Sequence, residues 1–237
     1  INRTFNPANR LQTGGKACFL YYDTDIDLMV LNDGGRISRI GADFSRNLGA
    51  NLEVHGEWAR LKDIDRRIVD PTGAARTERS DVSSWLLGLR YLTEKELTVI
   101  GEYYRNGTGY SAAEYRDFSR YAVAAINQYQ TTGVDTTLRR ASSLVQGAYG
   151  RPQPMRSYFY LRASQKEPFD ILYFTPAVTA IYNVEDRSYS VVPELFYTGY
   201  TNVELRARFF LLNGNRLTDF GEKQNTRRVE FLARYYF

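Results

Sequence analysis

The 237-residue chain has one cysteine and one histidine. A single cysteine cannot form a disulfide within the chain. One histidine with one cysteine cannot build a Cys/His zinc site or supply the ligands of a haem. We therefore expect no bound metal ion and no cofactor.

Long apolar runs and long basic runs are also missing. No stretch approaches the roughly 18 to 20 apolar residues of a membrane-spanning helix. Lys and Arg outnumber Asp and Glu by only 31 to 27, and no Lys/Arg run exceeds two residues. The interleaved charges predict no nucleic-acid partner.

The start of the chain lacks an initiator methionine and a basic-then-apolar leader. Residues 6–10, Asn-Pro-Ala-Asn-Arg, have the composition of an internal loop. We expect the sequence to begin part-way through a longer chain.

What the chain has in abundance is aromatic residues, with 19 Tyr, 13 Phe and 2 Trp, arranged with a period of two. In the last segment Val229, Phe231, Ala233, Tyr235 and Phe237 share one face. Charged residues occupy most of the alternate positions. This is the period of a β-strand and not of a helix.

Ten segments show this alternation, and most have the roughly 9 to 12 residues that a tilted strand needs to cross a bilayer. They cover residues 16–31, 36–46, 51–61, 82–92, 97–106, 156–164, 169–182, 187–198, 202–212 and 226–237. Asp23-Thr24 would divide the first segment into two short strands.

The connections alternate in length. Those at 46–51, 93–96, 164–168 and 198–201 are short, whereas 62–81, 107–155 and 213–225 are long and polar. Two further short connections, at 33–35 and 183–186, lie at the same end of the strands as the long ones. Short periplasmic turns and long outer loops are typical of transmembrane barrels.

A water-soluble sandwich or lipocalin-like barrel would alternate too. Three observations favour a membrane barrel: the polar face is highly charged, the strands are long, and aromatic residues of the apolar face lie at the strand ends. The predicted membrane girdle contains Trp58, Trp85, Tyr103, Tyr189 and Tyr235.

The C-terminal segment resembles the end of bacterial outer-membrane β-barrel proteins, in which a final Phe follows aromatic or apolar residues at alternate positions. Tyr235 and Phe237 would form this signal, and the resemblance implies insertion by the barrel-assembly machinery. Residues 41–48 together with 102–107 are similar to porin-like bacterial proteins. The implied fold is an all-β, antiparallel, up-and-down transmembrane barrel over residues 1–237. This chain would hold about ten strands, as a whole barrel or as the C-terminal part of a larger one.

The charged face is the predicted lining of the pore. Acidic residues gather on the early strands and arginines on the late ones, so a closed barrel would carry a field across its lumen. The predicted pore-lining residues are Asp43, Glu53, His55, Glu57, Arg90, Glu102, Arg162, Glu204, Arg206, Arg208, Arg228, Glu230 and Arg234. A narrow barrel filled by paired charges is the alternative.

No catalytic motif is present. His55 between Glu53 and Glu57 could be a general base, but its strand position fits a polar residue of the lumen. We expect no enzymatic activity. Residues 112–130, within the long loop at 106–155, carry apolar residues at helical spacing. A loop of this length is typical of a lid, a constriction or a receptor surface, and a solvated outer loop is the alternative.

These patterns predict a porin-like channel for small hydrophilic solutes in the outer membrane of a Gram-negative bacterium. The alternative is a barrel that sheaths or anchors a partner such as a cytochrome. Expected partners are outer-membrane lipid, the assembly machinery, small polar solutes, and further copies of the chain or a partner protein. Ten strands leave an interior mostly filled by side chains, since an aqueous pore takes about 16, so the channel interpretation needs more strands than these.

Overall fold

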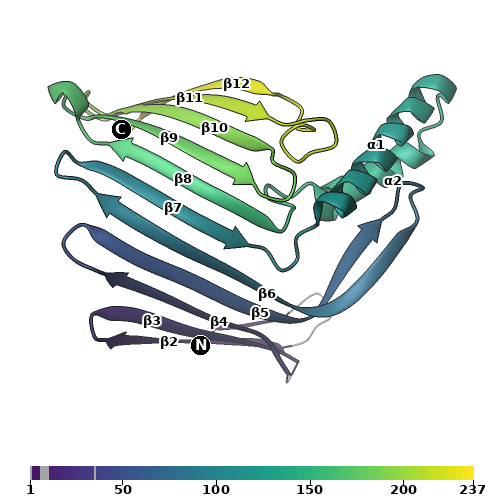
Figure 1. The fold of residues 1–237 in the computed structure, drawn as a ribbon, viewed down its shortest axis with the longest axis horizontal. Coiled ribbons are helices and arrows are strands. Elements are labelled where there is room, and N and C mark those ends of the chain that lie inside the picture. Colours follow the sequence, from purple (N-terminus) through teal and green to yellow (C-terminus); the bar gives the residue numbers. More distant parts are fainter. Residues whose placement is uncertain (1, 6–10, 35) are drawn as a thin grey trace.

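The computed structural model describes residues 2–5, 11–34 and 36–237, most of which form one antiparallel sheet (Figure 1). The strands run in sequence order, each pairing with the next, from β1 to β12. They are β1 Asn2–Phe5, β2 Leu11–Tyr21, β3 Thr24–Asp33, β4 Arg36–Asn47, β5 Leu52–Val69, β6 Ala75–Leu92, β7 Leu97–Arg105, β8 Ser157–Gln165, β9 Phe174–Asn183, β10 Tyr189–Tyr197, β11 Val203–Asn213 and β12 Arg227–Tyr235.

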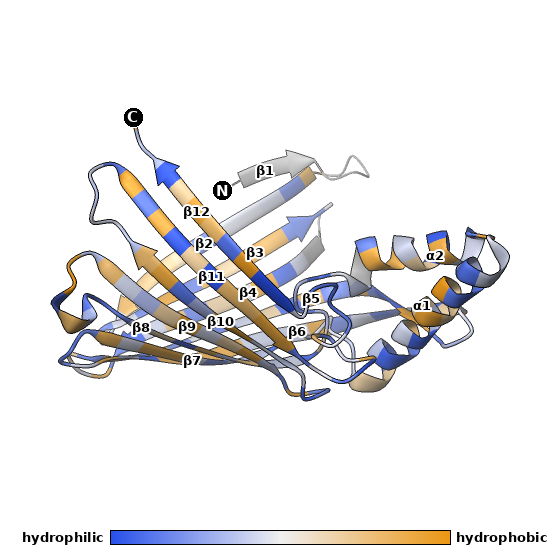
Figure 2. Cartoon of the chain, turned by 90° about the horizontal axis from the view of Figure 1, so that it is seen from above, coloured by the Kyte–Doolittle hydropathy of each residue, from blue (hydrophilic) through white to orange (hydrophobic). Residues whose placement is uncertain are grey.

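The predicted all-β, antiparallel, up-and-down arrangement of the strands is therefore confirmed. Closure is not seen: within the described residues β1 and β12 do not pair, and the sheet curves into an open trough (Figure 2). The break expected at Asp23-Thr24 is confirmed as the β2–β3 turn, where Tyr22 and Asp23 have positive φ.

Two boundaries differ from the prediction. Residues 62–81 are not a loop, because β5 and β6 continue through them as a hairpin arm that turns at Asp70–Ala74. Strand β9 begins at Phe174 and not at residue 169, since Pro168–Asp170 form a 3₁₀ turn. Backbone with positive φ at Glu167, Phe169 and Tyr173 cannot continue a strand.

The long loop contains α1, Ala112–Thr132, and α2, Thr136–Leu144, which continues into a π-helical turn at Val145–Tyr149. Ser111 and Glu114 form a capping box at the start of α1, and Gly133 ends it with φ 71°. The helical spacing predicted over 112–130 is thus confirmed. None of the helices in the described residues is long and apolar enough to cross a membrane.

The buried hydrophobic core lies at the end of the sheet that carries the arm and the helices (Figure 1). Its centre is a stack of three rings: Tyr149 lies 4.1 Å from Tyr110 and 3.9 Å from Phe118, between ring centroids. The arm contributes Ile68 and Val69, whose amide donates to the Tyr149 hydroxyl at 3.1 Å. The turns at 48–51, 93–96, 166–173 and 198–202 lie at the opposite end, as predicted. The helix end carries the long connections 106–156 and 214–226, but the third connection predicted to be long is the arm with its short turn.

Candidate channel surface

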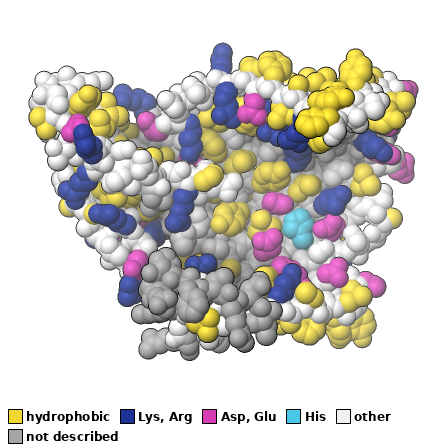
Figure 3. All heavy atoms as spheres, turned by 180° about the vertical axis from the view of Figure 1, so that it is seen from behind, with side chains coloured by type: hydrophobic (Ala, Val, Ile, Leu, Met, Phe, Trp, Pro, Cys, Tyr) yellow, Lys and Arg dark blue, Asp and Glu magenta, His cyan; other side chains and the backbone are white. Residues whose placement is uncertain are grey.

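The register of the strands gives the sheet two unlike faces. On the convex face, positions such as Leu87, Leu205 and Phe231 are apolar and exposed; Phe231 is 77% exposed. On the concave face the alternate positions are mainly charged or polar (Figure 3). The cause is the pleat, which directs successive side chains to opposite faces.

Aromatic side chains of the convex face form a row toward the end that carries the helices. Trp58 is opposite Trp85 in the register, and the Trp85 ring lies 5.2 Å from Tyr103, which lies 4.8 Å from Phe159. The row continues across the next strands through Tyr182 to Tyr189. Tyr235 lies instead at the turn end of β12, so the predicted girdle residues divide between the two ends.

All thirteen predicted pore-lining residues lie on the concave face, because the register places them at positions of one parity. The structure brings them together in two groups. One lies on β4–β7 around His55, and the other lies on β8–β12 around the arginines. Their role as a pore lining remains a prediction.

His55 connects the acidic group. Its Nε2 lies 3.4 Å from Glu102 Oε1, while its Nδ1 lies 3.7 Å from Glu53 Oε1, beyond hydrogen-bond distance. Arg90 also approaches Glu53, at 3.6 Å. A Cβ at Gly88 would lie 2.2 Å from His55 Nε2, so a larger residue at this position would force the imidazole to move.

The same contacts bear on catalysis. Ser45 is opposite His55 in the register, yet no hydrogen bond between the two occurs in the described structure. His55 instead directs Nε2 to the Glu102 carboxylate, and its buried Nδ1 has no hydrogen-bond partner among the described residues. Among the residues that the structure describes, no group of three or more His, Cys, Asp or Glu is placed to hold a metal ion.

Glu194 is the centre of the arginine group. Its carboxylate accepts from Arg208 Nε at 2.7 Å and from Arg162 Nη2 at 3.3 Å, and Arg208 also reaches Glu230 at 3.3 Å. A second carboxylate, Glu204, pairs with Arg206 at 3.2 Å and with Arg234 at 3.4 Å. Carboxylates therefore offset part of the arginine charge on this side.

The sequence prediction did not include Glu194, although its position has the same parity as the neighbouring polar residues of β10. Lys16 and Asp27 were also missed; they form an ion pair on the concave face beside Cys18. This pair could have been predicted from the alternation in β2 and β3 together with the expected break at Asp23-Thr24, because the turn there shifts the concave positions from even to odd residue numbers.

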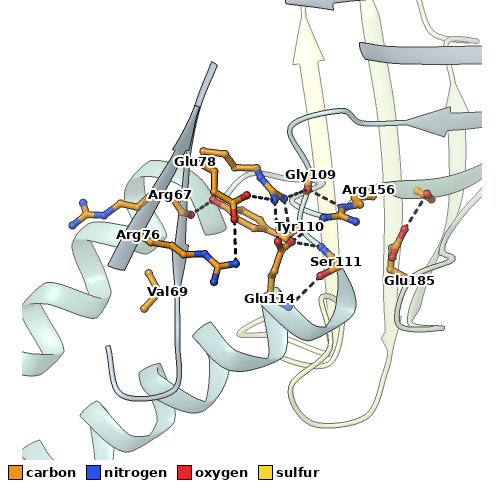
Figure 4. Close-up of polar contacts among 12 residues, drawn as sticks. Arg67, Val69, Arg76, Glu78, Gly109, Tyr110, Ser111, Glu114, Arg156 and Glu185 are labelled. Carbon is orange, nitrogen blue, oxygen red and sulfur yellow. Dashed lines mark hydrogen bonds and ion pairs between the residues drawn. The ribbon is translucent and has the colours of Figure 1, made fainter. Parts of the chain in front are cut away.

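Outside the strands of the sheet wall, an ion-pair cluster holds the arm against α1 (Figure 4). Arg66 on the arm contacts Glu114 through both guanidinium ends, at 2.9 and 3.1 Å, and also contacts Glu78 at 3.0 Å. Arg156 reaches the same Glu114 carboxylate at 3.3 Å. Burial raises the pKa of Glu114, but the Ser111 amide and the two arginines outweigh it and hold that pKa below its usual value.

The loop at 214–226 is fastened to the same end. Asp219 is fully buried, accepts from the Tyr158 hydroxyl at 2.9 Å and pairs with Lys223 at 2.9 Å. Its amide donates to Asp186 at 2.6 Å. Burial raises the pKa of the Asp219 carboxyl.

No protein-family model matches the chain, and no curated protein matches it. Among solved structures, the outer-membrane expressed OmpT of Vibrio cholerae is similar, with a TM-score of 0.48 and 11% sequence identity. The match covers 96% of this chain and 66% of that one, so the chain spans just under two thirds of that structure's length.

Proposed function

We propose that the sheet is part of the wall of an outer-membrane barrel in a Gram-negative bacterium, and that this barrel conducts small hydrophilic solutes without catalysis. The observation that carries the proposal is the contrast between the two faces of the same strands. The convex face is apolar and uncovered, whereas the concave face is charged.

Water is a poor solvent for the convex face. Soluble monomers seldom expose continuous apolar patches beyond a few hundred Å². Here exposed Leu, Val, Phe and Trp side chains recur on strand after strand. The aromatic row from Trp58 to Tyr189 fits the headgroup level of a bilayer, where amphipathic rings are favoured. This supports lipid as the surroundings of this face.

The concave face suits water. Most of its ion pairs are partly exposed to solvent. About a third of the side-chain surface of Arg162, Arg206 and Arg208 is accessible in each case. A dry interior would penalise that many charges. The two helices extend beyond the strand ends and leave the trough free of them (Figure 2). Both features support a passage for polar solutes.

A barrel that sheaths a partner protein is the second candidate. The open sheet favours it: among the described residues the outer edge of β12 has no neighbouring strand, so the trough is accessible from the side. A partner held there would face the same charged side chains.

Insertion through the barrel-assembly machinery is part of the proposal. Tyr235 closes β12 and stacks near Phe237, with ring centroids 6.5 Å apart. Both rings are exposed and available to such a partner.

Conductance across a planar bilayer tests the channel. The purified full-length protein should give ohmic steps, and the triple variant Arg206→Gln, Arg208→Gln, Arg234→Gln should shift the reversal potential toward cation selectivity in a salt gradient. The shift is expected because screening acts over about 8 Å at physiological salt, within reach of much of a narrow pore. Silent membranes would favour the sheathing barrel. An open channel whose selectivity is the same in the triple variant would show that these arginines do not determine ion selectivity.

A further inference from the structure

A hollow of about 410 Å³ lies on the concave face near the helix end of β3–β7. Its floor exists because small side chains stand opposite one another in the register: Gly41 pairs with Ala59, and Ala59 with Ser84. Met29 begins this row on β3. The neighbouring rows carry larger side chains, which form the walls of the hollow. Its volume falls in the range of small-molecule sites, about 300 to 1,000 Å³.

The walls are largely apolar. Leu31, Leu86 and Tyr104 project from the concave face around the floor. Such side chains favour a ligand with an apolar body, because each apolar area removed from water stabilises the complex. The Tyr104 ring also offers an edge or a face to a flat ring of the ligand. Figure 3 shows apolar side chains exposed on this face beside the single histidine and its acidic neighbours.

One edge of the hollow carries an excess of negative charge. Asp43 and Glu57 stand side by side in the register at one edge of the hollow. Glu57 makes no hydrogen bond or ion pair within the described part of the chain. Asp43 lies next to Asp27, and Lys16, which pairs with Asp27, also interacts electrostatically with Asp43. Three carboxylates, Asp27, Asp43 and Glu57, therefore face one lysine at this edge, and the negative excess beside an apolar floor suits a cationic ligand.

Among the described side chains that line the hollow, the one basic residue, Arg39, lies at the other edge. Arg39 and Asp43 are four residues apart on β4, about 13 Å along the strand. Arg39 also makes no hydrogen bond or ion pair among the described residues. An ammonium group is therefore attracted to the Asp43 and Glu57 edge and repelled from the Arg39 edge, so the charges fix the ligand's direction.

We propose that this hollow is a binding subsite for a small organic cation with a flat apolar body, of the aromatic-amine class. The ammonium group sits at Asp43 and Glu57, and the ring lies over Gly41 and Ala59 against Leu86 and Tyr104. The proposal deepens the channel function, since it names a class of solute that the passage retains.

Binding of 2-phenylethylammonium tests the subsite, measured by equilibrium dialysis against the full-length protein in lipid nanodiscs, with empty nanodiscs as the blank. Two other probes separate the contributions: 3-phenylpropionate keeps the ring and reverses the charge, and ethylammonium keeps the charge without the ring. We expect saturable binding of 2-phenylethylammonium that is at least about tenfold tighter than that of either other probe.

Two variants locate the site. Glu57→Gln removes the charge at nearly constant shape, and Ala59→Leu fills the floor; each should weaken binding about tenfold or more. Glu230→Gln, a carboxylate of the arginine group on β12, is the matched control and should leave binding unchanged. Heat-modifiable mobility on gels checks that each variant is folded. Equal binding of the anionic probe, or binding that both site variants leave intact, would overturn the proposal.

Failure of the binding subsite can be distinguished from failure of the channel. A protein that conducts but does not bind the amine keeps the channel and loses the subsite. A protein that binds the amine through Glu57 but gives no conductance keeps the subsite and loses the channel.

Discussion

Arg66 and Glu114 form a bidentate ion pair between the arm and the first turn of α1, with N–O distances of 2.9 and 3.1 Å. Both side chains are largely buried, at 14% and 15% exposure. This pair joins two segments that have no strand pairing with each other, and it fixes the helical loop beyond the end of the trough.

Arg66→Ala should release the helical loop. Without Arg66, the Glu114 carboxylate keeps Arg156 and the Ser111 amide but loses its two shortest arginine contacts, which costs about 1 to 3 kcal/mol. Limited proteolysis should then cut within residues 107–155 far faster, while the heat-modifiable mobility of the sheet stays the same. Arg79→Ala is the control, because Arg79 pairs with Asp65 in an exposed position and should not alter cleavage. Identical digestion of both variants would mean that the pair does not hold the loop.

The same contact should depend on pH. The folded-state pKa of Glu114 lies below its ordinary 4.5, so its stabilisation is fully present above that pH and is lost as the pH falls through the folded pKa. Hydrogen exchange of residues 111–121, corrected for intrinsic rates, should accelerate as the pH falls into the acidic range below 4.5. In Glu114→Gln the exchange should be fast at every pH in this range. A wild-type profile that is flat across it contradicts the assignment.

The strands of the wall could be predicted from the sequence, whereas the arm and its contacts could not. A strand between lipid and water must alternate, and β11 and β12 do so along their length. In the arm both faces meet water over most of residues 62–81, so only Ile64 and Ile68 mark a face and the segment has the composition of a loop. The Arg66–Glu114 pair spans 48 residues, and nothing local in either segment indicates its partner.

The alternation along a strand predicts which face of the sheet a side chain occupies, and it predicts nothing more about that side chain's role. Parity placed Glu53, His55 and Glu102 on one face, but it does not say which of them touch. The hollow depends on small residues from three strands that meet only in the register, so no single segment of the sequence shows it. Glu194, by contrast, could have been predicted to lie on the concave face from the alternation in β10.

Leu87→Arg should destabilise the membrane wall by about 2 to 4 kcal/mol, the cost of a charge near the bilayer midplane. Val178→Arg should do the same on β9. Leu86→Arg is the matched control, since the adjacent position faces the trough, where the charge stays hydrated. Heat-modifiable mobility on gels reports the difference. Equal loss of the folded band from Leu86→Arg and Leu87→Arg would show that the two faces are assigned wrongly.

Glu194→Gln should move ion selectivity in the direction opposite to the arginine variants. Without this carboxylate, Arg162 and Arg208 lose their shared partner, and the positive potential of this side increases. The reversal potential in a salt gradient should shift toward anion selectivity. Glu96→Gln, on the exposed β6–β7 turn, should produce no shift. A shift toward cation selectivity from Glu194→Gln would contradict the role given to this residue.

The central claim is that one face of the sheet meets lipid and the other meets water. Nitroxide labels placed one at a time at residues 204–209 of β11, in a Cys18→Ser background and reconstituted in bilayers, test it most directly. The account predicts a period of two: labels at Leu205, Ala207 and Phe209 accessible to oxygen dissolved in the lipid, and labels at Glu204, Arg206 and Arg208 accessible to a water-soluble nickel complex. Accessibility to the nickel complex at all six positions, or the reverse alternation, would contradict it.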